Sequence, residues 1–535
     1  MSPLCQVPVV AAASSSANVL AEAGRRRTFA IISHPDAGKT TLTEKFLLYS
    51  GSIGLAGSVK DRRNERAAKS DWLELEQKRG ISVSSAVMRF EHRGAVFNLL
   101  DTPGHRDFSE DTYRVLSGVD AAIMVLDGSR GIEPQTLKLF EVCRRRGTPL
   151  ITFVNKMDRP SLDPLEILDD IERQIGLVAT PVTWPVLHNG HFSGVVDRRD
   201  NTFHRFAHDA SHGSKMAVES EGTLADAVAI APGVADEVGL LTETGADHDD
   251  ELFLAGETTP VFFGSALSNF GVRLLLDAIV DLAPPPSPRR NISGDDRPIE
   301  SDCSGIVFKI QANMDPRHRD RMAFVRICSG RFERGMVLTC SRSGRQITAK
   351  YVHEAMGQDR QTIDEAFAGD VVGLVNATDL RIGDSLYQET PVTYPGLPTF
   401  TPELFHVAQP GDRNRIKQFR NGLEQLDQEG VIQVLRHAEL GDQAPLVAAV
   451  GVLQFEVAAW RMENEFGCPL RLESTSRSVA RRTEEDCVPA LSELREVEIY
   501  RRSDGTPLAL FRDEYQLARI VRENPELTLD VIVGG

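Results

Sequence analysis

The strongest constraint on the fold of this chain is an apolar segment that leads through a short loop into a helix-forming segment. Residues 28–32 read Thr-Phe-Ala-Ile-Ile, a run typical of a buried strand, and residues 42–47 are predicted to continue as a helix. The loop between them, residues 33–41, reads Ser-His-Pro-Asp-Ala-Gly-Lys-Thr-Thr. A strand, a tight loop and a helix in this order place the N–H groups of a helix N-terminus where they can bind an anion.

The loop matches the phosphate-loop pattern Gly-x-x-x-x-Gly-Lys-Ser/Thr except at its first position, where Ser33 replaces glycine. Gly38 lets the backbone approach a phosphate, Lys39 can bring a positive charge to the β- and γ-phosphates, and the Thr40 hydroxyl can bind Mg²⁺. An ordinary serine-containing loop before a helix remains the alternative for these residues alone. The predicted nucleotide-binding residues here are Ser33, His34, Pro35, Asp36, Ala37, Gly38, Lys39, Thr40 and Thr41.

A second motif, Asp101-Thr102-Pro103-Gly104-His105, follows two short predicted strands over residues 86–90 and 95–100. A carboxylate at a strand end, here Asp101, can hold Mg²⁺ through a water molecule, and the N–H group of Gly104 can contact a γ-phosphate. Asp, Pro and Gly are also common turn residues, so a plain turn explains the motif in isolation. Its position after a phosphate loop and two strands favours nucleotide binding.

A third motif, Asn155-Lys156-Met157-Asp158, follows the apolar run at residues 150–154. The Asp158 carboxylate can accept two hydrogen bonds from the ring N–H and amine of guanine, whereas adenine offers no matching donors. Asn155 can tie the phosphate loop to this strand. A solvated strand end is the alternative for the motif alone. Ser265 and Ala266 follow the last predicted strand of this region, and their backbone can reach the carbonyl group of the base.

The three motifs lie in a region with the pattern of an α/β fold. Near-continuous apolar runs at residues 121–126 and 150–154 are typical of parallel strands covered by helices on both faces, and residues 134–146 are predicted to form the crossover helix. We therefore expect a GTP-binding domain over residues 25–283 with a mostly parallel sheet. It includes an insertion near residues 183–258, made of hairpins and an acidic, partly helical stretch at 211–250.

Several histidines occur in or near that insertion. Turn residues separate them and no carboxylate spacing accompanies them, so the pattern does not favour a metal site. The histidines are His188, His191, His204, His208 and His212.

The rest of the chain predicts two further domains. A proline-rich linker at residues 284–291 precedes short alternating strands, which indicate a small antiparallel β-barrel over residues 303–390. A second linker at residues 391–402 precedes a mixed segment, expected to form an α+β domain over residues 402–535. Residues 1–24 are rich in Ala and Ser and are expected to form a disordered extension.

One predicted helix of the last domain has a defined apolar face. Its members have helical spacing and are expected to be core residues: Ile416, Phe419, Leu423 and Leu426.

Composition excludes several classes of protein. The formal net charge of −17 argues against a general polyanion binder. Seven scattered cysteines with no Cys-x-x-Cys pair indicate neither a disulfide framework nor a zinc site, which fits a reducing compartment. No apolar run approaches the length of a membrane span. We expect a cytoplasmic protein.

The order of the three motifs resembles that of the translational GTPases, and within them the chain resembles the bacterial class-II peptide chain release factors. The resemblance runs from about Arg26 to at least Phe466. It rests on residues 33–40, on Lys-Ser-Asp-Trp at 69–72, on Glu-Asp-Thr-Tyr-Arg at 110–114, and on two strings at 307–316 and 318–321.

This resemblance implies binding of GTP and GDP with Mg²⁺, and GTP hydrolysis stimulated by the ribosome during termination. Lys39 and Thr40 would bind phosphate and Mg²⁺, Asp158 would select guanine, and His105 would orient the attacking water. Ser82 would take the Mg²⁺-ligand place that is threonine in elongation factors. The partners implied are the ribosome and the codon-reading class-I release factors, with no membrane contact, and a monomer is expected.

Three alternatives remain at this stage. A translocase of the elongation-factor-G type would continue into two further domains, for which we expect no room after Phe466. A carrier of the elongation-factor-Tu type would be shorter and would have two barrels. A non-hydrolysing GTP-gated switch would not need a water-orienting side chain such as His105.

Overall fold

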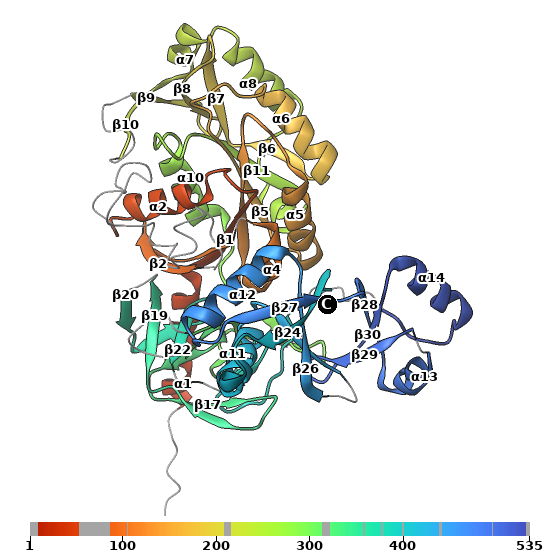
Figure 1. Cartoon of the computed structure of the whole chain (residues 1–535). Helices are drawn as coiled ribbons and strands as arrows, with labels where there is room; N and C mark the ends of the chain where they lie inside the picture. The colour runs from red at the N-terminus through yellow and green to blue at the C-terminus, as the bar shows by residue number, and fades with distance from the viewer. Residues whose placement is uncertain are drawn as a thin grey trace, which may run out of the picture.

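The structure is a computed structural model, and three large sheets organise it (Figure 1). It describes residues 9–52, 86–103, 105–207, 216–312, 321–356, 359–375, 377, 379–397, 401–437, 441–494 and 496–530.

The first large sheet has seven strands in the order β2-β3-β1-β4-β5-β11-β6. Only the edge strand β2 is antiparallel to its neighbour, so the sheet is mostly parallel, as predicted. The strands are β1 (Arg26–Ser33), β2 (Ala86–His92), β3 (Ala95–Asp101), β4 (Ala121–Asp127), β5 (Leu150–Asn155), β6 (Val178–Pro181) and β11 (Thr258–Phe263).

Helices cover both faces of this sheet because its strands are apolar on both sides. Phe29 and Ile31 of β1 pack in one core cluster with residues of α2 (Lys39–Tyr49) and α10 (Val272–Leu282). Ala30 and Ile32 belong to a second cluster on the opposite face. That cluster includes residues of α4 (Ser109–Leu116), α5 (Pro134–Arg146) and α6 (Pro164–Asp170), which a π-helical turn (Ile171–Ile175) extends.

The parallel order brings four strand ends to one edge of the sheet. Strand β1 lies between β3 and β4, and β5 pairs with β4 so that Asn155 lies beside Asp127. The C-terminal residues Ser33, Asp101, Asp127 and Asn155 therefore share an edge, which is where ligands bind in open α/β sheets.

The insertion forms an antiparallel sheet in the order β10-β9-β8-β7 with two helices beside it (Figure 1). The predicted hairpins are confirmed, and the acidic stretch contributes a strand as well as helices. The elements are β7 (Thr183–His188), β8 (His191–Asp197), β9 (Thr202–Ala207), β10 (Val218–Thr223), α7 (Leu224–Ile230) and α8 (Val234–Glu243), followed by α9 (Asp250–Leu254).

Two histidines of the insertion are cross-strand neighbours in this sheet, and a third lies elsewhere in it. His188 and His191 are exposed on paired ends of β7 and β8, whereas His204 is buried on β9. His208 and His212 lie outside the described residues. In the described part of the chain, no group of three or more His, Cys, Asp or Glu side chains is arranged to hold a metal ion.

The second large sheet is antiparallel and corresponds to the predicted barrel. Its strand order is β18-β17-β23-β14-β15-β22-β19-β20, with the pair β16-β21 beside it. The elements are β14 (Ser304–Ala312), β15 (Arg321–Ser329), β16 (Arg331–Glu333), β17 (Val337–Cys340), β18 (Gln346–Thr348), β19 (Val352–Met356), β20 (Asp359–Thr362), β21 (Glu365–Phe367), β22 (Val371–Val375) and β23 (Ser385–Tyr387).

The predicted linker before this sheet is not wholly irregular. Its last residues form β12 (Arg289–Arg290), which pairs with β13 (Asp296–Arg297) in a short hairpin.

The third large sheet belongs to the C-terminal α+β domain, and its order is β27-β24-β26-β25-β29-β30-β28. The strands are β24 (Leu404–Pro410), β25 (Gln433–His437), β26 (Gly441–Ala449), β27 (Leu470–Ser474), β28 (Val479–Arg482), β29 (Glu498–Arg501) and β30 (Pro507–Phe511). The helices are α11 (Ile416–Gln428), α12 (Val452–Asn464), α13 (Val488–Glu493) and α14 (Glu514–Glu523). With this domain, the predicted fold class is confirmed.

One expected core residue of α11 is exposed. Phe419, Leu423 and Leu426 are buried, but Ile416 is 47% exposed. Ile416 is the first residue of the helix, one turn before the part that packs on the sheet, which explains the error.

The expected disorder at the N-terminus is wrong for the described residues, because Val9–Gly24 form helix α1. Val19 and Ala23, one helical turn apart, pack on Ile299, Phe367 and Ala368 next to the barrel. We missed this helix because the apolar partners that stabilise it lie far away in the sequence. Residues 1–8 lie outside the described part.

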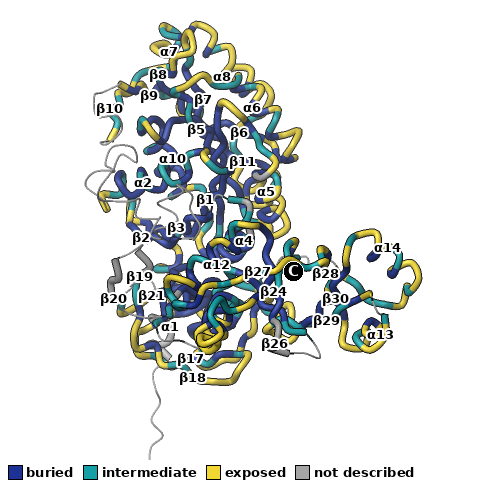
Figure 2. The backbone as a smooth tube through the Cα atoms, viewed as in Figure 1, coloured by how far each residue is buried: buried dark blue, intermediate teal, exposed yellow. Residues whose placement is uncertain are grey.

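The distribution of buried residues differs from one part of the molecule to another. Figure 2 shows that residues along the strands of the first large sheet are buried, with exposed segments on the insertion and on the lobe that carries α13 and α14. In the part of the chain that the structure describes, no helix is both long enough and apolar enough to cross a membrane.

Candidate GTP-binding site

The phosphate loop connects the end of β1 to the start of α2. Gly38 precedes the helix with a φ of 102°, in the left-handed region that favours glycine. A Cβ atom at this position would lie 2.2 Å from Nδ2 of Asn155. Both the positive φ angle and the short distance to Asn155 therefore require glycine at position 38. Without a side chain there, the backbone at the start of α2 can form a close cradle for an anion.

Lys39 joins the first motif to the second. Its Nζ atom lies 2.6 Å from Oδ1 of Asp101, and both side chains are buried. Thr102, which follows, donates a hydrogen bond from its hydroxyl to the Ile31 carbonyl at 2.7 Å and so fixes the end of β3 against β1. Pro103 is also buried.

Asn155 joins the first motif to the third and to β11. Its amide nitrogen donates to the Ala37 carbonyl at 2.7 Å, so the predicted tie between the phosphate loop and this strand is confirmed. Its amide oxygen accepts a hydrogen bond from the Ala266 N–H group at 2.8 Å. The Met157 N–H group donates to the Gly264 carbonyl at 3.0 Å. These bonds bring all the predicted strand-end motifs together.

Lys156 of the third motif contacts the backbone of the phosphate loop. Its Nζ atom donates to the Asp36 carbonyl at 2.5 Å and to Oδ2 of Asp127 at 2.7 Å. Burial alone would raise the pKa of Asp127, but hydrogen bonds from Lys156 and Ser129 outweigh it and lower that pKa. Asp127 was not among the predicted site residues, although its place at the end of an apolar strand was a usable signal.

Asp158 lies half-buried at the end of the third motif. The Ser268 hydroxyl donates to its Oδ2 atom at 3.1 Å, which orients the carboxylate. Ser265 and Ala266 are fully buried next to this serine. Nothing in the sequence pattern identified Ser268, because its contact with Asp158 depends on how two distant loops meet.

His34 lies inside the phosphate loop rather than at its surface. It is 1% exposed, and its Nε2 atom lies 3.4 Å from Oε1 of Glu133, the residue before α5. Burial lowers the pKa of His34, although the nearby Glu133 carboxylate opposes this shift. Among the described residues, neither ring nitrogen has a hydrogen-bond partner.

Four other residues of the loop lie nearer the surface. Asp36 is exposed and has a φ of 65°, while Pro35, Thr40 and Thr41 are half-buried. Ser33 is buried and donates to the carbonyl of its neighbour His34 at 2.9 Å. Asp36 is thus the one exposed residue of the phosphate loop, residues 33–41, all of which the structure describes.

His105 follows the end of β3 and is 34% exposed at its side chain. Its Nδ1 atom accepts a hydrogen bond from the Asp107 N–H group at 3.2 Å, and its ring packs edge-on to Phe108. Gly104 and the expected Mg²⁺ ligand Ser82 lie outside the described residues, as do Asp71, Trp72 and the rest of residues 53–85.

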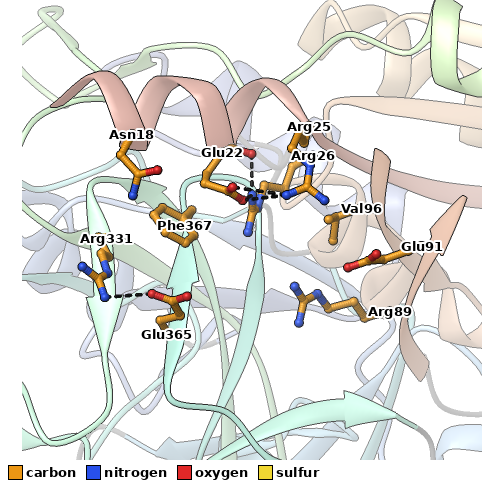
Figure 3. Close-up of a pocket in the computed structure, with 10 residues that line it drawn as sticks. All are labelled: Asn18, Glu22, Arg25, Arg26, Arg89, Glu91, Val96, Arg331, Glu365 and Phe367. Carbon is orange, nitrogen blue, oxygen red and sulfur yellow. Dashed lines mark hydrogen bonds and ion pairs between the residues drawn. The ribbon is translucent and has the colours of Figure 1, made fainter. Parts of the chain in front are cut away.

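A separate cavity of about 350 Å³ lies between α1, β2 and the barrel (Figure 3). Its arginines are paired with carboxylates: Arg331 lies 2.8 Å from Glu365, and Arg26 pairs with Glu22 and Asp370. None of its lining residues belongs to the three motifs. This cavity is therefore distinct from the GTP-binding candidate.

Comparison with family models divides the chain into three matches. Residues 24–285 match the elongation factor Tu GTP binding domain, residues 302–389 match elongation factor G domain 2, and residues 394–521 match the C-terminal domain of the class II release factor RF3.

Curated relatives resemble almost the whole chain. A peptide chain release factor 3 from Synechococcus elongatus is 47% identical over 514 residues, which cover 94% of this chain and 92% of that protein. One from Gloeobacter violaceus is 45% identical over 526 residues, with 96% and 98% covered. A crystal structure of a protein from Thermus thermophilus shares the fold, with a TM-score of 0.68, 24% identity and 85% of this chain covered, against 68% of that chain.

The parallel sheet, its strand-end motifs and the match to the elongation factor Tu domain define the class: this is a translational GTPase, an enzyme that binds GTP and GDP and hydrolyses GTP. Two further findings narrow the class. The curated relatives are 45–47% identical to this chain over nearly its full length, and residues 394–521 match the C-terminal domain of the class II release factor RF3. The chain belongs to the peptide chain release factor 3 family, which confirms the resemblance seen in the sequence.

Proposed function

We propose that this chain is a GTPase of translation termination, stimulated by the ribosome, that promotes the departure of class-I release factors and does not itself read stop codons. The observation that carries the proposal is the meeting of three nucleotide motifs at one sheet edge, joined by the Lys39–Asp101 and Asn155–Ala37 contacts. The curated relatives named peptide chain release factor 3 support the place in termination rather than in translocation.

The nucleotide would lie across this edge. Backbone N–H groups of the phosphate loop and the Lys39 ammonium group would bind the phosphates, and Asp158 would accept hydrogen bonds from guanine. The proposed nucleotide-binding residues are Ser33, His34, Pro35, Asp36, Ala37, Gly38, Lys39, Thr40, Thr41, Asp101, Thr102, Pro103, Gly104, His105, Asn155, Lys156, Met157, Asp158, Ser265 and Ala266.

The residues at this edge also fit a magnesium ion. Thr40 follows Lys39 at the start of α2, and Asp101 contacts the Lys39 ammonium group, so this edge of the sheet offers a hydroxyl and a carboxylate, and oxygen ligands suit Mg²⁺. Bound Mg²⁺ would neutralise negative charge on the phosphates. We assign Thr40 as a direct ligand, Asp101 as a ligand through water, and Ser82 as a further ligand.

His105 is the proposed catalytic residue. Its Nδ1 atom accepts a hydrogen bond, so in the neutral ring the proton resides on Nε2, which can donate to an attacking water molecule. Hydrolysis in this class depends mainly on positioning and on stabilising charge, so the ring would orient the water rather than form a covalent bond.

The partners and the domain limits follow from the same proposal. The chain would bind ribosomal RNA and proteins and class-I release factors as a monomer in the cytoplasm. The domains would span residues 25–283, 303–390 and 402–535, because each range contains its own large sheet.

One experiment tests this function. GTP turnover is measured with the purified protein alone, with vacant ribosomes, and with termination complexes that carry a labelled class-I release factor, whose dissociation is followed in the same samples. We expect turnover to rise with ribosomes and the factor to leave faster. If ribosomes stimulate GTP turnover but the class-I factor does not dissociate faster, the chain is a ribosome-stimulated GTPase and its proposed role in termination is rejected.

A further inference from the structure

The turn that follows His105 contacts the C-terminal domain. Residues Arg106–Phe108 form a short 3₁₀ turn, η1, and Oδ2 of Asp107 accepts a hydrogen bond from the Leu453 N–H group at 2.8 Å. Leu453 is the second residue of α12, and the first N–H groups of a helix have no partner inside it. The Asp107 carboxylate therefore caps a helix of another domain (α12 lies beside α4 in Figure 1).

The start of α12 is shaped to receive this carboxylate. A Cβ atom at Gly451 would lie 2.0 Å from Cγ of Asp107. The φ of Gly451 is −149°, extended backbone that any residue adopts, so the close approach of Asp107, and not the backbone conformation, requires glycine here. Phe108 extends the contact, because it packs in a cluster with Val457 and with Leu453.

A second contact joins the same two domains through other elements. A Cβ atom at Gly430, just after α11, would lie 1.9 Å from Nη1 of Arg114, so this guanidinium group lies directly against the Gly430 backbone. Glu110, one turn earlier on α4, pairs with Arg114. The segment from η1 to α4 is thus attached to the C-terminal domain at both ends.

Asp107 also holds His105. Its N–H group donates to Nδ1 of His105 at 3.2 Å, and its Oδ1 atom lies 3.5 Å from the same nitrogen. One residue therefore connects the proposed catalytic ring to α12: its backbone fixes the ring while its side chain caps the helix.

We propose that Asp107 is a positioning residue that holds His105 in place only while α12 is docked, so that GTP hydrolysis depends on the position of the C-terminal domain. This inference rests on the proposed role of His105. A three-residue turn has little structure of its own to fix its shape, so the anchored carboxylate holds the turn and, with it, the hydrogen bond to Nδ1. Undocking of α12 releases the ring and slows hydrolysis.

The first test disrupts the contact between Asp107 and α12 by a substitution at Gly451, which is not among the proposed nucleotide-binding residues. Gly451→Ala places a methyl group where the carboxylate lies, and Val452→Ala is the matched control, because Val452 is the next residue and its side chain is 60% exposed. We expect Gly451→Ala to lower the ribosome-stimulated kcat about tenfold, with the Kd for GTP unchanged, since small misplacements of catalytic groups cost up to about 100-fold. Val452→Ala should match wild type.

A second set of variants changes Asp107, the other partner in this contact. Asp107→Ala removes the acceptor and should lower kcat as Gly451→Ala does, whereas Asp107→Asn keeps an oxygen acceptor suited to a helix cap and should restore most of it. The double variant Asp107→Ala/Gly451→Ala should be no slower than either single variant, because both remove one contact.

Hydrogen exchange reports the contact without any catalysis. In Gly451→Ala and Asp107→Ala the amides of Leu453 and of residues 105–108 should exchange faster than in wild type. Faster exchange with a wild-type kcat would overturn the proposal, as would additive losses in the double variant. A wild-type kcat in His105→Ala would instead reject the catalytic role of His105 itself, whatever the exchange data show.

Discussion

The ammonium group of Lys39 lies 2.6 Å from a carboxylate oxygen of Asp101, and both side chains are buried at the edge of the parallel sheet. Each residue has a proposed role toward the nucleotide, Lys39 toward phosphate and Asp101 toward Mg²⁺. In their contact with each other, each neutralises the buried charge of its neighbour. The same pair therefore supports the fold of the domain and the proposed binding site.

The first prediction concerns this pair. Asp101→Asn leaves the Lys39 charge buried without a carboxylate, and breaking a buried ion pair in this way costs about 3–5 kcal/mol of unfolding free energy. Denaturant unfolding of the nucleotide-free protein should show the loss. Saturating GDP should recover a large part of it, because a phosphate group then pairs with Lys39. An unfolding free energy equal to that of wild type would mean that the pair contributes nothing.

The second prediction concerns base selection. Asp158→Asn should weaken GTP binding by about tenfold or more, because each charge-assisted hydrogen bond is worth about 1.5–3 kcal/mol. The Asn side chain offers an N–H donor, so binding of xanthosine triphosphate, which has a carbonyl in place of the guanine amine, should improve. Ser268→Ala, which only removes the group that orients Asp158, should weaken GTP binding less. Equal GTP affinity in Asp158→Asn and wild type would remove Asp158 from the base site.

The third prediction concerns the phosphate loop. Gly38→Ala should abolish measurable GTP binding and lower the unfolding free energy by about 1–3 kcal/mol, because Ala is strained at a φ of 102° and its Cβ would strike Asn155. Gly24→Ala is the control, since its Cβ would meet no atom within 4 Å. Calorimetric titration with GTP and thermal unfolding measure the two effects. Retained GTP affinity in Gly38→Ala would contradict the proposed cradle.

The fourth prediction concerns catalysis. His105→Ala should leave GTP affinity at the wild-type value and remove most of the ribosome-stimulated hydrolysis, because the variant keeps the backbone of this nucleotide-binding segment and loses only the ring, which is proposed to orient water. Without stimulation, hydrolysis by such GTPases is slow, about 10⁻⁴ to 10⁻² per second. Rapid mixing with ribosomes distinguishes the rate of stimulated GTP hydrolysis from the slow unstimulated rate. A variant stimulated as strongly as wild type would end the assignment.

The fifth prediction concerns pH. Burial lowers the pKa of His34, so below about pH 6.5 the unfolded chain binds a proton at this residue more readily than the folded protein does. Stability should therefore fall as the pH drops from 7 to 5, by at most about 1.4 kcal/mol per pH unit from this group. The charges that act on the ring are Glu133, Asp127, Arg130 and Lys156.

Unfolding at several pH values measures this effect, with His34→Gln as the comparison. The variant keeps a polar side chain of similar reach but cannot titrate, so its stability should depend less steeply on pH over this range. Parallel curves for the two proteins would show that His34 does not contribute.

Much of this site was predictable because its motifs are local. The phosphate loop, the Asp101 motif and the Asn155 motif each follow an apolar strand directly, so each strand places its motif without help from distant residues. The order of strands and helices then predicted a mostly parallel sheet, and parallel strands end at a common edge.

The contacts between motifs were less predictable. Asn155 could be expected to reach the phosphate loop, but Ser268 beside Asp158 and Asp127 beside Lys156 were missed. Such contacts depend on the register of neighbouring strands and on the path of loops, which no local pattern contains.

The sequence by itself determined the class of fold, the three nucleotide motifs and the family, because short-range patterns of apolar residues, glycine and charge specify strands, turns and phosphate loops. Only the tertiary structure decided that Val9–Gly24 form a packed helix, that Ile416 is exposed, and that Asp107 caps α12. The packing of α1 and the capping of α12 depend on partners hundreds of residues away, and the exposure of Ile416 depends on where α11 begins to pack on its sheet. The free energy of such contacts exists only once the separate segments have packed together.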